Sequence, residues 1–167
     1  MRVDTIEPPD LHHLNAARGW LELGNVPEAW LEVQEIVPRW HEHPDVLNLM
    51  WDLYAAEKEW PKALAIARQM ISRHADDVSG WIHQSYALHE MKQTAEARDA
   101  LSRAIGRFPD EGIIPYNLAC YECQLGQFGT AKRWLGLAEK IQGKATLKKM
   151  ALSDPDLKPI WDYVRSL

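Results

Sequence analysis

The sequence of 167 residues has little of several features that mark particular classes of protein. Its only cysteines are Cys120 and Cys123, too few for the disulfide framework of a small secreted domain. No apolar run approaches the ~20 residues of a membrane-spanning helix, and residues 1–9 lack the apolar stretch of a signal peptide. No glycine-rich phosphate loop, nucleophile motif or paired-carboxylate signature is present. These absences favour a cytoplasmic, non-enzymatic protein without a metal or cofactor and without membrane contact.

Basic residues are scarce in the first part of the chain. Residues 1–60 carry 12 acidic and 4 basic side chains, whereas residues 61–167 carry 12 acidic and 15 basic ones. Helix faces of differing composition explain this asymmetry most simply, and the alternative is that it orients a partner. The sequence pI of about 5.8 argues against nucleic-acid binding, which more often goes with a basic footprint.

What the sequence does have is a repeat. Four alanines, Ala29, Ala63, Ala97 and Ala131, recur at a constant spacing of 34 residues in similar local sequence. Set in register, the copies run over residues 10–43, 44–77, 78–111 and 112–145 with no insertion. A fixed period of this length indicates stacked helix-turn-helix units. A recurring alanine suits a close helix crossing, where a larger side chain would push the backbones apart.

The apolar pattern around each alanine predicts the second helix of a pair. Apolar residues follow it at intervals of four and three, as on one face of a helix; they are Val33, Ala67, Leu101 and Leu135, then Ile36, Met70, Ala104 and Ala138. Short turns such as Gly24-Asn25-Val26-Pro27 precede these helices. Pro27 and Pro61 suit the first turn of a helix, where a missing N–H costs nothing.

These residues resemble the tetratricopeptide-repeat family. Trp81 takes the early Trp place of the third copy, Tyr54 the Tyr place of the second, and Leu118-Ala119 the Leu-small pair of the fourth, while Phe108-Pro109 ends the third copy. Trp51 and Gln84 depart from the pattern. The resemblance covers residues 10–145 and implies an all-α, right-handed α-solenoid of four 34-residue helix-turn-helix units.

The two ends differ from the repeats. Residues 1–9 are expected to form a short N-terminal arm, and residues 146–167 a half-unit and a capping helix. Asp154 is the expected N-cap and Pro155 a first-turn residue, with a last helix over residues 156–164. Leu157, Ile160, Trp161 and Val164 have the spacing to cover the last apolar face of the stack. The closing Asp-Pro-Asp-Leu turn resembles that of bacterial tetratricopeptide proteins.

The resemblance also implies a function, which is binding of a partner protein. In the family the first helix of each pair lines a concave groove, and a mixture of apolar and amide side chains there suits a peptide or helix of a partner. Carried over to this chain, the groove residues are Asn15, Arg18, Asn48, Asp52, Ile82, His83, Tyr86, His89, Tyr116, Asn117, Cys120 and Gln124. The carboxylate clamp that holds chaperone tails is excluded, because only Asn15 matches it. A secretion-type chaperone is an alternative, and the oligomeric state stays open.

An alternative of another class is a metal- or thiol-dependent enzyme. Cys120 and Cys123 share one helix face, and with His83 and His89 they make a set of zinc-ligand types. However, a redox Cys-x-x-Cys normally lies at a helix N-terminus, which lowers the thiol pKa, whereas this pair is expected in the middle of a helix. Small core residues are therefore the favoured interpretation of both cysteines.

Overall fold

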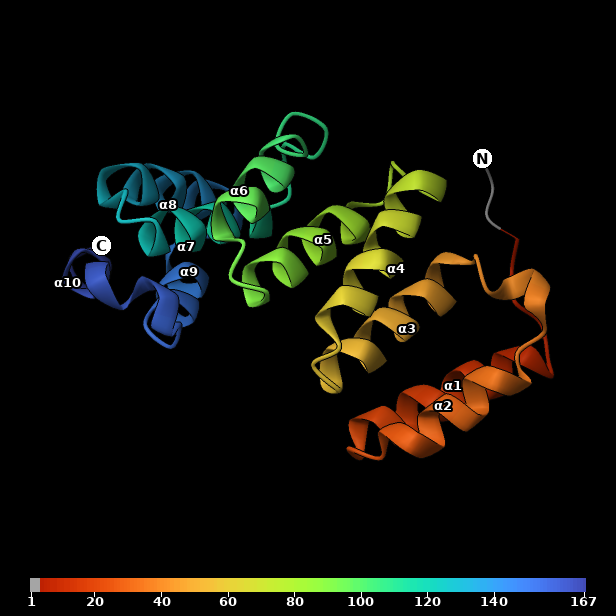
Figure 1. The fold of residues 1–167 in the computed structure, drawn as a ribbon. Helices are drawn as coiled ribbons and strands as arrows, with labels where there is room; N and C mark the ends of the chain where they lie inside the picture. The colour runs from red at the N-terminus through yellow and green to blue at the C-terminus, as the bar shows by residue number, and fades with distance from the viewer. Residues whose placement is uncertain (1–3) are drawn as a thin grey trace. The chain divides into compact units, whose positions relative to one another are not determined.

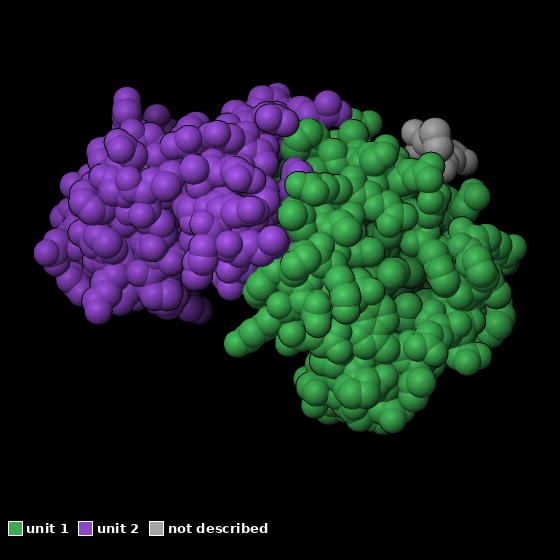
Figure 2. All heavy atoms as spheres, viewed as in Figure 1, with its two compact units in different colours: residues 1–83 green, residues 84–167 purple. Residues whose placement is uncertain are grey.

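The computed structural model describes residues 4–167, and every regular element among them is helical (Figure 1). The chain divides into two compact units, residues 1–83 and 84–167 (Figure 2). The division falls within helix α5 (Val78–Glu90). The all-helical prediction is thus confirmed for the described residues.

Unit 1 consists of two helix hairpins and the first half of α5. Helix α1 (Asp10–Glu22) packs against α2 (Val26–Glu35), and α3 (Pro44–Ala56) packs against α4 (Trp60–Arg73). A short 3₁₀ turn, η1 (Pro38–Trp40), connects the hairpins, and both α1 and α2 contact α3.

Unit 2 consists of the second half of α5 and six further elements. Helix α6 (Thr94–Ser102) packs against α7 (Ile113–Gln124), which forms a hairpin with α8 (Phe128–Gln142). Helix α9 (Lys144–Ala151), the 3₁₀ helix η2 (Pro155–Ile160) and α10 (Trp161–Ser166) complete the unit. Because α6, α8 and η2 all pack on α7, that helix is buried on nearly every side. Even Glu122 is buried there, with its Oε2 4.0 Å from Nη1 of Arg98.

The turn inside each pair repeats with the same period as the alanines. Gly24, Lys58, Lys92 and Gly126 all have a positive φ, between 58° and 75°. In each case the residue that follows donates its backbone N–H to a carbonyl five positions earlier, at 2.8–2.9 Å. A left-handed residue closed by this bond ends an α-helix and turns the chain back. Glycine adopts that conformation without strain, whereas lysine does not.

The core is built from the predicted apolar positions. The four recurring alanines are fully buried, and the apolar residues that follow them at intervals of four and three are buried as well. In unit 1 a single cluster joins Leu14 and Ala17 of α1, Ala29 and Val33 of α2, and Leu49 and Leu53 of α3. The four alanines are therefore core residues of their helices.

The described residues before α1 and after α9 pack on the repeats. Residues 1–3 of the predicted arm lie outside the described residues, but Ile6 is buried in the core cluster of unit 1. Asp10, at the start of α1, accepts the backbone N–H of Val37 at 2.8 Å.

At the other end, Asp154 caps η2 by accepting the N–H of Asp156, which confirms the predicted N-cap, and Pro155 is the first residue of η2. The last helix, expected over residues 156–164, is instead divided into η2 and α10. The division follows Pro159, which has no N–H for an α-helical bond. Within residues 4–167, no helix has the length and apolar character needed to cross a bilayer.

Candidate partner-binding site

Half of the predicted groove residues lie in unit 1. They are Asn15 and Arg18 on α1, Asn48 and Asp52 on α3, and Ile82 and His83 on α5. Asn15, Arg18 and Asp52 are exposed, whereas the other three are half-buried. Nη2 of Arg18 lies 3.4 Å from Oδ1 of Asp45, which joins α1 to α3 through an exposed ion pair. Such pairs contribute about 1 kcal/mol at most.

His83 is held in a defined position by two neighbours on α3. Its ring stacks on that of Trp51, with the centroids 3.9 Å apart and the planes 9° from parallel. Its Nε2 lies 3.0 Å from Oδ1 of Asn48, whose Nδ2 donates to the carbonyl of Pro44 at 3.0 Å. Because Oδ1 of the amide can only accept, Nε2 of His83 carries the proton. The other ring nitrogen, Nδ1, is then an acceptor.

Burial also determines the charge of this site. It lowers the pKa of His83 to about 4, although the negative charge of Asp77 opposes the shift. The imidazole is therefore neutral at neutral pH. Although Asp52 is exposed, desolvation of its carboxyl raises its pKa, and the positive charge of Arg18 opposes that shift. The face thus combines a neutral donor–acceptor ring with one guanidinium and one carboxyl group.

The remaining predicted residues lie in unit 2, where the chain's own C-terminal segment contacts most of them. Tyr116, Cys120 and Gln124 form one stripe along α7, at intervals of four residues. The hydroxyl of Tyr116 donates to Oδ2 of Asp154 at 2.9 Å, and the thiol of Cys120 lies 3.4 Å from the same oxygen. Nε2 of Gln124 donates to the carbonyl of Asp156 at 2.8 Å.

His89 completes this contact from α5. Its Nε2 lies 3.0 Å from Oδ2 of Asp156, and its Nδ1 lies 3.0 Å from Oγ1 of Thr94. Its ring also contacts that of Tyr121, with centroids 5.1 Å apart. Three hydrogen-bonding side chains of α7 and one of α5 therefore hold residues 154–156 in place.

The C-terminal segment thus covers two of the predicted groove residues, Tyr116 and Cys120. Tyr116 is 5% exposed and Cys120 is 4% exposed, because the segment with Asp154 covers them. Partner contact at these two positions stays a prediction that would require the segment to move. Tyr86 is 42% exposed, and Asn117 is half-buried. Desolvation raises the pKa of Tyr86, as do the nearby carboxylates of Glu90, Asp156 and Asp154.

The two cysteines are buried free thiols on α7. Burial raises the pKa of Cys120, and the adjacent Asp154 carboxylate raises it further. Burial raises the pKa of Cys123 as well. Both therefore stay protonated at neutral pH, whereas nucleophilic or metal-binding cysteines act as thiolates. Among residues 4–167, no three His, Cys, Asp or Glu side chains come together in a way that could hold a metal ion.

Sequence reasoning missed three residues that matter for these sites, which are Trp51, Asp154 and Asp156. The sequence marks Trp51 only as a departure from the repeat pattern, although a tryptophan and a histidine on the same face of neighbouring helices can stack. Asp154 was predicted to cap a helix with its side chain, which it does through Oδ1. Its second oxygen, Oδ2, accepts from Tyr116, which lies 38 positions earlier in the chain. The carboxylate of Asp156 binds His89, which lies 67 positions earlier. No local pattern carries that information.

No family model matches this sequence, and no curated protein matches it either. Solved structures do. A protein of Podospora anserina described as a kinesin light chain with nearly identical TPR-like repeats is 18% identical, with a TM-score of 0.68 over 97% of this chain and 96% of that one. MamA of RS-1, in an ArsTM double-mutant form, is 16% identical, with a TM-score of 0.68 over 93% and 90%. MamA of MSR-1 is 16% identical, with a TM-score of 0.65 over 80% and 76%.

These similarities establish the fold at low sequence identity. The predicted class, all-α with tetratricopeptide-type helix hairpins, is confirmed, and the chain has the fold of tetratricopeptide-type repeat proteins.

Proposed function

We propose that this chain is a non-enzymatic protein-interaction module that binds a peptide or helical segment of a partner protein. The TPR-like fold of its structural neighbours supports an interaction scaffold. The proposed binding face lies in unit 1, on α1, α3 and the first half of α5. It comprises Asn15, Arg18, Asn48, Asp52 and His83, and we refer to it as the unit 1 face.

The observation that carries this proposal is the fixed, neutral His83. Its stacking on Trp51 and its bond to Asn48 orient the ring without a partner, so binding costs little ordering entropy there. A neutral imidazole with Nδ1 as acceptor suits a backbone N–H of a bound segment. Arg18 and Asp52 add one donor group and one acceptor group to the exposed part of the face.

The corresponding stripe in unit 2 supports the choice of unit 1. There the donors of Tyr116, Gln124 and His89 already bind the chain's own residues 154–156. A partner at that stripe would have to displace the buried Leu157 and Ile160 as well. The acidic pI and the mixed charges of the unit 1 face favour a protein partner over nucleic acid or a membrane.

Peptide selection followed by a charge-matched comparison tests the proposal. Random peptides displayed on phage would be enriched on the purified chain, and the affinity of the enriched peptides would be measured by fluorescence anisotropy. The double variant Arg18→Ala/Asp52→Ala should weaken binding by roughly tenfold or more, the scale of interface hot spots.

The matched control is Arg68→Ala/Glu96→Ala, which removes one exposed charge of each sign from α4 and α6. It should bind the peptides as tightly as the wild type. The proposal fails if no peptide is enriched, or if the control variant loses binding while Arg18→Ala/Asp52→Ala keeps it.

A further inference from the structure

A second surface of unit 1 has an open hollow between its first two helices. The hollow has a volume of about 350 Å³ and is lined by Ala16, Gly19, Trp20 and Leu23, and by Glu32 of α2. Leu23 is 77% exposed, although it is a large apolar residue. A Cβ atom added to Gly19 would meet nothing within 4 Å, so open space lies directly above this backbone. We call this surface the α1–α2 end face.

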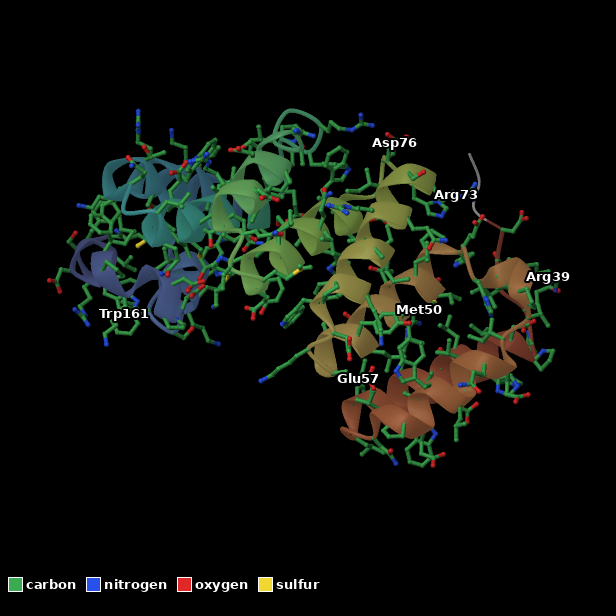
Figure 3. All side chains as sticks on the ribbon, in the orientation of Figure 1. Arg39, Met50, Glu57, Arg73, Asp76 and Trp161 are labelled. Atoms are coloured by element: carbon green, nitrogen blue, oxygen red, sulfur yellow. The ribbon has the colours of Figure 1, made fainter. Side chains whose placement is uncertain are left out.

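The second repeat shows what packs on the equivalent surface there. The residues 34 positions later are Met50, Leu53, Tyr54 and Glu57 of α3 and its C-terminal end, and in the structure α2 packs on this helix. Leu53 is fully buried, and Met50 packs against the core cluster that includes α2 residues. The rings of Trp30 and Tyr54 have centroids 4.7 Å apart, and Nε1 of Trp30 donates to Glu57 at 3.1 Å. Figure 3 labels Met50 and Glu57 on the side of α3 that faces α2.

The residues of the α1–α2 end face therefore have the spacing of a surface on which another helix packs. Ala16, Gly19, Trp20 and Leu23 are spaced by three, one and three residues, which places them in one row along α1. A row of this spacing is what a partner helix contacts when it lies in a groove between two helices. The small side chains of Ala16 and Gly19 make room for larger apolar residues on the incoming helix.

The charged residue that lines the hollow, Glu32, is acidic. Glu28, Glu32 and Glu35 recur at intervals of four and three and so share one face of α2, and Glu22 lies next to Leu23. No lysine or arginine occurs between Gly19 and Pro38. Nδ1 of His13 lies 2.7 Å from Oε2 of Glu32. An apolar seat with an acidic rim complements a helix that is apolar on one face and basic at its flanks.

We infer that the α1–α2 end face is a second docking surface and that its occupant is a basic amphipathic helix of a partner protein. A second copy of this chain fits less well, because pairing two such faces would bring their acidic rims together. The occupant's apolar row fills the hollow over Gly19 and covers Leu23, while its Lys or Arg side chains lie along the glutamates of α2. Binding should therefore weaken as salt rises.

The test uses a probe of defined chemistry. A fluorescent synthetic helix with a Leu/Ala face and lysines on both flanks would be titrated with the full chain and followed by anisotropy. The comparison peptide has glutamate in place of every lysine. We expect the lysine peptide to bind, with affinity falling at high salt, and the glutamate peptide to bind at least about tenfold more weakly.

Two matched substitutions locate the contact. Leu23→Glu changes an exposed leucine on the face, and Phe128→Glu changes a residue of unit 2 that is 43% exposed. Leu23→Glu should lower the affinity of the chain for the lysine peptide by roughly tenfold or more, whereas Phe128→Glu should leave that affinity unchanged. Because both residues are exposed, circular dichroism should show both variants folded. Glu28→Lys/Glu35→Lys should weaken binding and flatten its salt dependence.

Three results would overturn the inference. The first is no binding of the lysine peptide at about 1 mM protein, the limit of a weak specific interaction. The second is an equal loss of affinity in Leu23→Glu and Phe128→Glu. The third is a wild-type dimer in analytical ultracentrifugation that Leu23→Glu dissociates, which would assign the face to a second copy of the chain.

Discussion

Replacing Asp154 by alanine tests how the C-terminal segment is held on unit 2. The side chain of Asp154 makes three contacts at once. Oδ1 accepts the N–H of Asp156 at 2.9 Å, and Oδ2 accepts from the Tyr116 hydroxyl at 2.9 Å and faces the Cys120 thiol at 3.4 Å. Alanine removes all of them and leaves the partners in place.

The expected loss of stability follows from these contacts. Loss of a capping carboxylate costs about 1 kcal/mol. The Tyr116 hydroxyl belongs to a side chain only 5% exposed, and a buried donor without an acceptor costs about 1–3 kcal/mol. Asp154→Ala should therefore lower the free energy of unfolding by roughly 2–4 kcal/mol.

Urea titrations followed by circular dichroism measure this change, and a double-mutant cycle assigns it. Tyr116→Phe removes the donor, so Asp154→Ala should cost about 1–2 kcal/mol less in that background. The control is Asp162→Ala, because Asp162 is fully exposed in the same C-terminal region and pairs with the exposed Arg165 at 2.7 Å. This control should stay within about 0.5 kcal/mol of the wild type.

The reasoning would be refuted by an Asp154→Ala variant no less stable than the Asp162→Ala control. It would be refuted equally if the cycle showed no coupling between Asp154 and Tyr116. Either result would mean that the side chain of Asp154 does not hold the segment. The contacts of Asp156 with Gln124 and His89 and the burial of Leu157 and Ile160 would then hold it.

Two further predictions concern unit 1 and the turns. Burial lowers the pKa of His83 from 6.5 to about 4. Between pH 6.5 and about 4, His83 therefore binds a proton in the unfolded chain but not in the folded chain. The contribution of His83 to the free energy of unfolding is fully present above pH 6.5. It is lost as the pH falls to about 4, and the loss amounts to about 3 kcal/mol at most. Urea titrations across this range should show the loss in the wild type but not in His83→Gln, and an NMR titration midpoint of His83 near 6.5 would contradict it. Separately, Lys92 has φ 65° at a register where Gly24 and Gly126 occur. Lys92→Gly should raise stability by about 0.5–1 kcal/mol, because relief of left-handed strain exceeds the added entropy of the unfolded chain. A lower thermal midpoint for this variant would disprove the strain argument.

The helices and their core faces could be predicted because both depend on local sequence. Ala97 and Leu101 are four positions apart, and their burial follows from helical periodicity alone. The cap at Asp154 could be predicted for the same reason, since its oxygen binds an N–H two residues away. The division of the last helix was not predicted, although its cause is also local, because Pro159 has no N–H for an α-helical bond.

The candidate sites were predictable only in part. The family register placed all twelve residues in one groove. The structure joins Asn48 of α3 to His83 of α5 through a hydrogen bond, whereas Tyr116, Cys120 and Gln124 share a stripe of α7 because they are four residues apart. The family register could not show that one of these groups is open and the other covered. That difference arises from the path of residues 152–157, which returns the chain to α7.

The sequence by itself determined the period, the helix hairpins, the buried alanines and the short turns between paired helices, because each is set by residues within one repeat or by its nearest neighbour. Only the tertiary structure decided which surfaces are available. It placed Asp154 on Tyr116 and Cys120, stacked His83 on Trp51, and left Leu23 exposed beside a hollow where the next repeat has α2. The physical reason is that the contacts of Asp154 and of His83 join residues more than 30 positions apart, and their geometry depends on the packed backbone rather than on local preference.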